Sequence, residues 1–180
     1  MPPQLIATTR EDHVIAWFAA LAIAIHVLES AIPSPLPGIK LGLANIVTII
    51  ILIQFGWRSA AAVAMLRVII GSLILGSFLS PTFVLSFAGA AASLAALAIA
   101  SALGKHLLSA VGYSVIAAVA HLLAQFFTAY SLFMPHYALL HLLPIVMTAA
   151  AITGIFNGIL ALAIIKRLKF REHEPQHRFS

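Results

Sequence analysis

Apolar stretches of helix length follow one another along almost the whole chain, and this succession constrains the fold more than any other feature. Each stretch is close to the ~20 residues that an α-helix needs to cross the hydrocarbon core of a bilayer, although the second is marginal. We therefore predict an all-α membrane protein with six transmembrane helices, at residues 14–30, 41–55, 59–79, 81–103, 109–134 and 139–165.

The composition supports this class, because 62% of the residues are hydrophobic and 8% are charged, whereas soluble domains average roughly 45–50% and about 25%. The apolar segments leave no room for a separate soluble domain. Residues 1–170 are expected to form one transmembrane domain, and residues 171–180 a polar, basic C-terminal tail. We expect the first segment to be retained rather than cleaved as a signal peptide, since the later helices need it to set their orientation.

The lysines and arginines predict the orientation of the chain. An even number of crossings places both termini on one side, and an excess of these residues marks the cytoplasmic side. The other side carries Lys40, and Arg67 lies within a segment. We therefore expect a multi-pass protein of the bacterial-type cell (inner) membrane with both termini cytoplasmic. Eight lysines and arginines lie on the terminal side: Arg10, Arg58, Lys105, Lys166, Arg167, Lys169, Arg171 and Arg178.

The stretch from Glu29 to Asn45 interrupts the apolar pattern with three prolines, two glycines and several polar groups. Proline fixes φ and has no N–H, so no continuous helix crosses this stretch, and we predict an outward-facing connection between the first two helices. Glu29 and Lys40 stand near its two ends. They either pair with each other or contact a polar ligand, and an ordinary loop with an interfacial lysine is the alternative.

Arg67 is the clearest polar group within a predicted span, and such groups are costly enough to mark candidate sites. It lies eight residues after Ser59, roughly 12 Å into the membrane at ~1.5 Å per residue. The guanidinium either faces the interior with a structural or ligand-binding role, or snorkels to the cytoplasmic surface.

Two later helices carry further polar residues. His121, Gln125 and Thr128 share one stripe of the predicted fifth helix, where they line a cavity or form hydrogen bonds that only hold the bundle together. Gly154 and Gly158 of the sixth form a GxxxG pattern, which favours close helix packing over a binding role for the nearby threonines and asparagine.

Ala16, Ala20 and Ala24 place a small residue at every fourth position of the first predicted helix. Such a stripe lets another helix come close, either within the protein or from a separate membrane subunit. The histidines of the outer loop, His136 and His141, match no metal-binding spacing, and Cys is absent. We therefore predict no metal site and no thiolate chemistry.

Several of these residues fall in motifs that resemble the small membrane family known both as heptaprenyl diphosphate synthase component I and as Gx transporter. The resemblance covers about residues 25–160, and Leu122 departs from it, since an asparagine is expected after the histidine. The motifs are Glu29-Ser-Ala-Ile-Pro33, Pro37-Gly-Ile-Lys-Leu-Gly-Leu-Ala-Asn45, the helix of Arg67 with Gly71-Ser-Leu73 and Gly76, Ser86-Phe-Ala-Gly89, and His121 with Gln125.

That family is similar to the S-components of energy-coupling factor (ECF) transporters, which bind the transported substrate. The resemblance implies an S-component-like bundle with an outward-facing pocket closed by the first loop. It also implies that the alanine stripe docks on a transmembrane coupling subunit driven by ATPases. The expected partners are the lipid bilayer, a small-molecule substrate, and either such a coupling subunit or a second copy of the chain. No nucleic acid and no cofactor are expected.

The two family names imply different classes of function. Prenyl diphosphate synthesis needs clustered carboxylates to hold Mg²⁺, but Asp12 is the only aspartate, and no GxxxxGK[ST] phosphate loop is present. We expect no catalytic residues, and therefore no enzyme. The favoured function is uptake of a small organic solute, such as a vitamin or precursor, through an outward-facing pocket. The alternative is a non-catalytic membrane accessory subunit in isoprenoid, prenyl diphosphate or quinone metabolism.

The expected roles in the substrate site follow from side-chain chemistry. Lys40 and Arg67 are expected to hold an anionic group. Glu29 is expected to hold the loop or contact the ligand. Hydrogen bonds are expected from Asn45, His121 and Gln125.

Overall fold

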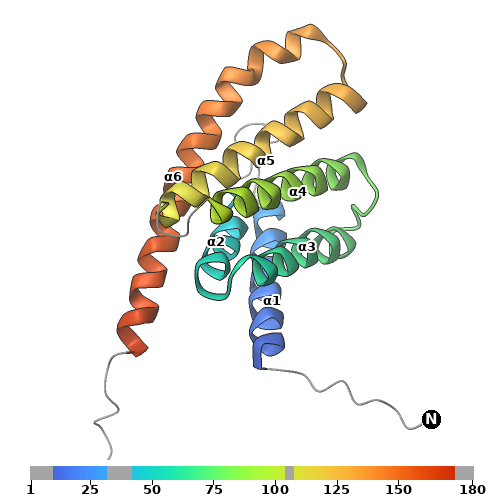
Figure 1. Ribbon diagram of the computed structural model, residues 1–180. Coiled ribbons are helices and arrows are strands. Elements are labelled where there is room, and N and C mark those ends of the chain that lie inside the picture. The colour runs from blue at the N-terminus through green and yellow to red at the C-terminus, as the bar shows by residue number, and fades with distance from the viewer. Residues whose placement is uncertain (1–9, 32–41, 104–107, 173–180) are drawn as a thin grey trace, which may run out of the picture.

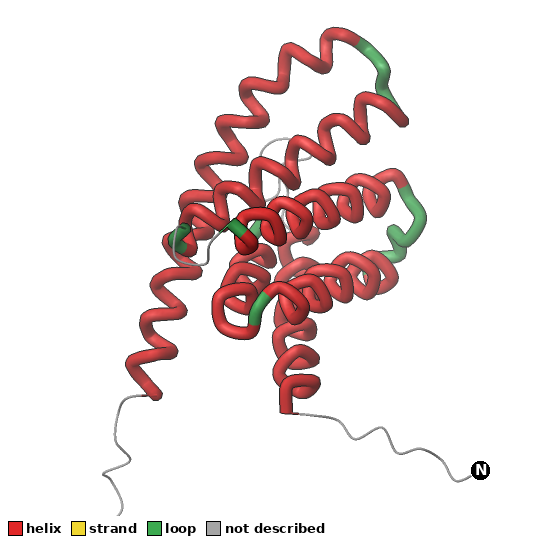
Figure 2. Tube along the Cα trace, viewed as in Figure 1, coloured by secondary structure: helices red, strands yellow, loops and turns green. Residues whose placement is uncertain are grey.

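The computed structural model describes residues 10–31, 42–103 and 108–172, and most of them are helical (Figures 1 and 2). This confirms the all-α prediction for the described residues. Five of the helical stretches found there are long and apolar enough to cross a membrane. The elements in order are α1 (Arg10–Ala31), α2 (Leu43–Phe55), α3 (Trp57–Ile74), α4 (Pro81–Ala102), α5 (Ala110–Leu132), the 3₁₀ helix η1 (Tyr137–Leu142) and α6 (Leu143–Glu172).

The second predicted span is the exception in length. Helix α2 has 13 residues, or about 20 Å at ~1.5 Å per residue, against a hydrocarbon core of ~30 Å. Gly42 and Gly56 bound it with φ angles of 68° and 88°, a region that glycine enters without steric cost and that ends a right-handed helix. The prediction of six spans is therefore not confirmed, because the described residues hold five helices of spanning length and one shorter apolar helix.

The predicted third span also ends earlier than expected. Helix α3 stops at Ile74, and Leu79, the predicted last residue, has a φ angle of 62°, which a right-handed helix does not accommodate. Helix α4 then begins with Pro81 in its first turn, where a missing N–H costs nothing. The hydroxyl of Ser80 accepts a hydrogen bond of 3.3 Å from the Phe83 N–H and caps this helix.

Helix α2 lies at the centre of the hydrophobic core. Its residues from Ile46 to Leu52 are all buried, and they pack with Ala19 and Ala22 of α1 and with apolar residues of α3, α4, α5 and α6. Burial of a helix on all sides is typical of a protein core rather than of a lipid-facing span. The long helices thus surround a short central one.

Helices α5 and α6 pack closely because of two glycines. A Cβ placed on Gly158 would lie 2.5 Å from Cα of Val111, and one on Gly154 would lie 2.8 Å from Cα of Val115. These distances are too short for any side chain, so the GxxxG pattern serves helix packing, as the sequence predicts. The indole N–H of Trp57 joins α3 to α4 by donating to the Leu94 carbonyl oxygen at 3.1 Å.

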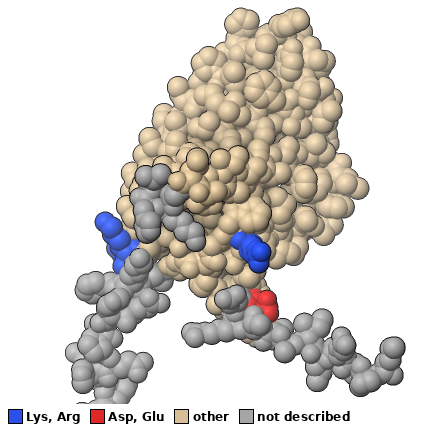
Figure 3. Space-filling view, viewed as in Figure 1, with Lys and Arg blue, Asp and Glu red and all other residues tan. Residues whose placement is uncertain are grey.

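The ends of the helices agree with a shared side for the two termini. Helix α1 begins and α6 ends at the bottom of Figure 2, whereas the connection after α3 lies at the right and that after α5 at the upper right. On the face shown in Figure 3, the charged side chains gather at the lower end, and the rest of the described surface is uncharged. A surface without charge is what lipid tails require. The assignment of the lower end to the cytoplasm stays a prediction.

Candidate binding cavity between the helices

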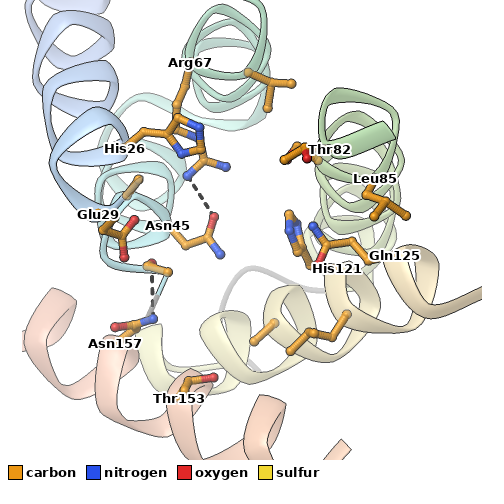
Figure 4. A pocket seen from close by; sticks show the side chains of 16 residues that line it. His26, Glu29, Asn45, Arg67, Thr82, Leu85, His121, Gln125, Thr153 and Asn157 are labelled. Atoms are coloured by element: carbon orange, nitrogen blue, oxygen red, sulfur yellow. Dashed lines mark hydrogen bonds between the residues drawn. The ribbon is translucent and has the colours of Figure 1, made fainter. Parts of the chain in front are cut away.

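A cavity of about 160 Å³ lies between the helices, and residues of all six line it (Figure 4). The first three helices contribute the charged wall, from His26, Glu29, Asn45 and Arg67. The last three contribute a neutral polar wall, from Thr82, Ser86, His121, Gln125, Thr153 and Asn157. Polar groups from distant parts of the sequence therefore converge on one partly open cavity, which is the usual form of a small-molecule site.

Arg67 is buried at the cavity, with 6% of its surface exposed. This placement agrees with the inward-facing alternative rather than with snorkelling. Its Nη1 donates to Oδ1 of Asn45 at 3.0 Å, whereas Nε is buried with no hydrogen-bond partner among the described residues. A buried cation is costly unless it is paired. The guanidinium thus carries donor capacity that the described protein does not use.

Glu29 holds the start of α2. One of its carboxylate oxygens accepts a hydrogen bond of 2.7 Å from the backbone N–H of Leu43, the first residue of α2, where the N–H groups have no partner within the helix. The negative charge also acts electrostatically on Arg67. Glu29 therefore has the loop-holding position that the sequence analysis allowed, and its side chain lines the cavity as well.

Asn157 of α6 also holds the start of α2, from the side opposite Glu29. Its Nδ2 donates to the carbonyl oxygen of Gly42 at 3.2 Å (Figure 4). Gly42 precedes α2 and has the left-handed backbone described above. Residues 42–45, the end of the Pro-rich stretch, are thereby tied to both α1 and α6.

His121 and Gln125 of α5 reach the cavity because Gly89 of α4 makes room for them. A Cβ on Gly89 would lie 2.8 Å from Nε2 of His121 and 2.9 Å from Cγ of Gln125. The His121 ring lies against Gly89, while its Nδ1 is buried without a partner among the described residues. Gly89 ends the Ser-Phe-Ala-Gly motif, so this contact explains why the motif ends in a residue without a side chain.

His26 is a cavity residue that the sequence reasoning missed. Its ring packs on α3 at Gly71, where a Cβ would lie 2.8 Å from Cδ2 of the ring. The available signal was its spacing of three residues from Glu29, which places both side chains on one face of α1. Thr153 and Asn157 were assigned to helix packing, yet both line the cavity.

The other predicted site residues are placed as follows. Lys40 lies outside the described residues. Asn45 joins Arg67 as stated above. Thr128, from the same stripe as His121, does not line the cavity, and across the described ranges no group of three His, Asp or Glu residues is arranged to hold a metal ion.

The three alanines of the predicted docking stripe are exposed on α1, at positions 16, 20 and 24. The alanines of α1 that pack inside the protein are Ala19 and Ala22. The neighbouring Trp17 is 79% exposed. The stripe therefore faces away from the core, and its docking role stays a prediction.

Comparison with known proteins identifies the family. No curated protein and no solved structure matches the chain significantly. The family model described as heptaprenyl diphosphate synthase component I matches residues 18–164, a range that includes all the cavity-lining residues named above. The chain therefore belongs to the heptaprenyl diphosphate synthase component I family, also called the Gx transporter family.

Proposed function

We propose that this protein is a non-catalytic, solute-binding membrane protein of the S-component type, which takes up a small organic solute through the cavity described above. The observation that carries this proposal is the buried Arg67, whose Nε has no partner in the described protein although it belongs to a cavity-lining side chain. A buried cation without a paired anion costs several kcal/mol. A bound anionic ligand beside the guanidinium would offset this cost.

The cavity walls suit recognition of a polar solute. Arg67 and Asn45 stand on one side, and His121 and Gln125 on the other (Figure 4). The amide of Gln125 both donates and accepts hydrogen bonds. A ligand that bridges the two sides would connect α2 and α3 to α5.

Transport of the solute requires a partner protein as well as the cavity. In this proposal the solute enters from the outer side and leaves inward after a rearrangement driven by a partner, either a coupling subunit with ATPases or a second copy. The exposed stripe of Ala16, Ala20 and Ala24 is the proposed docking face. Small residues permit the close backbone approach that helix association in a membrane depends on.

A second candidate follows from the family name, which describes a component of a prenyl diphosphate synthase. In that case the protein would be a non-catalytic membrane accessory that anchors or supplies a partner enzyme. The chain has a single aspartate, Asp12, so it lacks the carboxylate cluster that Mg²⁺ and a diphosphate would need for catalysis.

Mass spectrometry of protein purified gently in detergent tests the proposal. We expect a stoichiometric small molecule in the wild type, and its loss from Arg67→Gln and Gln125→Ala. The matched control is Arg58→Gln, which removes an exposed arginine at the start of the same helix. Equal ligand content in all four proteins would reject the cavity as the binding site. Recovery of a prenyl synthase without any small molecule would favour the accessory role.

A further inference from the structure

The size of the cavity limits its ligand. Its volume of about 160 Å³ equals roughly five water molecules in the liquid, at ~30 Å³ each. Pockets for drug-sized ligands have about 300–1,000 Å³. The part of a ligand that these residues contact is therefore compact, on the order of ten non-hydrogen atoms.

The charges around the cavity limit the charge of the ligand. Arg67 and Glu29 are its charged lining residues in the described part of the chain. No described residue forms a contact ion pair with Arg67, which donates a hydrogen bond to the neutral amide of Asn45. One negative charge on a ligand would therefore neutralise the guanidinium of Arg67. A second negative charge would be repelled by the carboxylate of Glu29, which accepts a hydrogen bond at the start of α2.

The donors of Arg67 limit how a ligand is held. Asn45 occupies Nη1, and Nε is buried with no partner in the described protein. A ligand in the cavity therefore meets the charge of the guanidinium without a two-oxygen contact that includes Nε. The remaining walls add neutral hydrogen-bonding groups from Thr82, Ser86 and Gln125.

From the size, the charge and the hydrogen-bonding walls together, we propose that the cavity binds a compact monoanion that carries a further polar group. This inference rests on the proposed solute-binding function and names its substrate class. It separates such acids from dicarboxylates, inorganic diphosphate and prenyl diphosphates.

The test measures thermal unfolding of the purified full chain in detergent with four probes: lactate, malonate, inorganic diphosphate and geranyl diphosphate. A ligand that binds the folded state raises the unfolding temperature in a concentration-dependent way, which gives an apparent Kd. Lactate and malonate are similar in size but differ by one charge. The variants are Arg67→Gln, Glu29→Gln and the control Arg58→Gln.

We expect lactate to bind more tightly than malonate by on the order of 30-fold or more, as one unit charge at roughly 4–8 Å and an effective dielectric constant of about 20 produces. Glu29→Gln keeps an acceptor for the Leu43 N–H but removes the charge, so it should bring the two Kd values together. Arg67→Gln should abolish protection by both acids, and Arg58→Gln should change neither. If Arg67→Gln does not fold, the ratio of the two Kd values in the wild type and in Glu29→Gln still tests whether the charge of Glu29 excludes a second negative charge.

Four results would overturn the inference. Stronger Arg67-dependent protection by malonate or either diphosphate would reject the monoanion class while leaving solute binding intact. Equal protection of Arg67→Gln and wild type by lactate would reject the assigned site. Absence of any protection, with no co-purified molecule, would reject the proposed function as well. If no probe protects but a molecule co-purifies, a single acidic group on it supports the inference, and a second acidic group or a prenyl chain overturns it.

Discussion

The contact between Gly89 and His121 leads to a prediction that separates binding from stability. In Gly89→Ala the new Cβ would lie 2.8 Å from both Cε1 and Nε2 of His121, and 2.9 Å from Cγ of Gln125. All three atoms belong to side chains, which can rotate away, whereas a clash with backbone would separate the helices. We therefore expect the substitution to displace both cavity residues and to leave the packing of α4 against α5 nearly unchanged.

The expected effect on unfolding is small because two contributions oppose each other. Replacing glycine by alanine inside a helix stabilises it by about 1 kcal/mol. Displacing His121 forces a rotamer change that costs about 0.5–1.5 kcal/mol. The net change in the free energy of unfolding should therefore stay within about 1–2 kcal/mol. Ligand binding loses the hydrogen bonds of two displaced side chains, so the Kd should rise by about tenfold or more.

The assay compares the unfolding temperature of ligand-free protein with the apparent Kd for lactate. The matched control is Gly112→Ala on α5, where a Cβ would meet Cδ2 of Leu108 at 3.1 Å, the end of a flexible side chain outside the cavity. The control should gain the same helix propensity and bind as the wild type does. Wild-type affinity in Gly89→Ala, together with lost affinity in Arg67→Gln, would refute the idea that Gly89 positions His121 and Gln125 for binding.

Three further predictions concern packing, docking and topology. Gly158→Ala places a Cβ 2.5 Å from the Val111 backbone, so it should destabilise the protein by about 1–3 kcal/mol in thermal unfolding; unchanged stability would contradict the close packing of α5 and α6. Ala20→Trp, at an exposed position of α1, should reduce recovery of a coupling subunit in a pull-down and leave the unfolding temperature unchanged; wild-type recovery would argue against the docking face. Because the chain has no cysteine, Ser131→Cys in intact cells should react with an impermeant thiol reagent, whereas Arg58→Cys should react after lysis; labelling of both in intact cells would refute cytoplasmic termini.

The class of fold could be predicted from the sequence, because apolar segments of helix length have few alternatives. The bounds of α2 differ from the predicted 41–55 by two residues at the start, where Gly42 takes a positive φ angle. Its burial in the core could not be predicted, since an apolar run does not tell a buried core helix from a marginal span.

The candidate site was predictable one residue at a time but not as an arrangement. Arg67, His121 and Gln125 stood out because polar groups are rare within apolar segments. Their meeting in one cavity depends on which helices pack together, and that depends on Gly71 and Gly89, whose contacts cross between helices. A single sequence contains the glycines but does not say which side chain each one admits.

The central position of α2 has a consequence for how the protein responds to its membrane. A helix that spans a bilayer adjusts to a thicker or thinner hydrocarbon region by tilting or by deforming the lipid around it. The stretch of α2 from Ile46 to Leu52 is enclosed by protein, so bilayer thickness acts on it only through its neighbours. Lipids of different chain length should therefore tilt the outer helices, together with the cavity residues that they carry, around Asn45 at the start of α2.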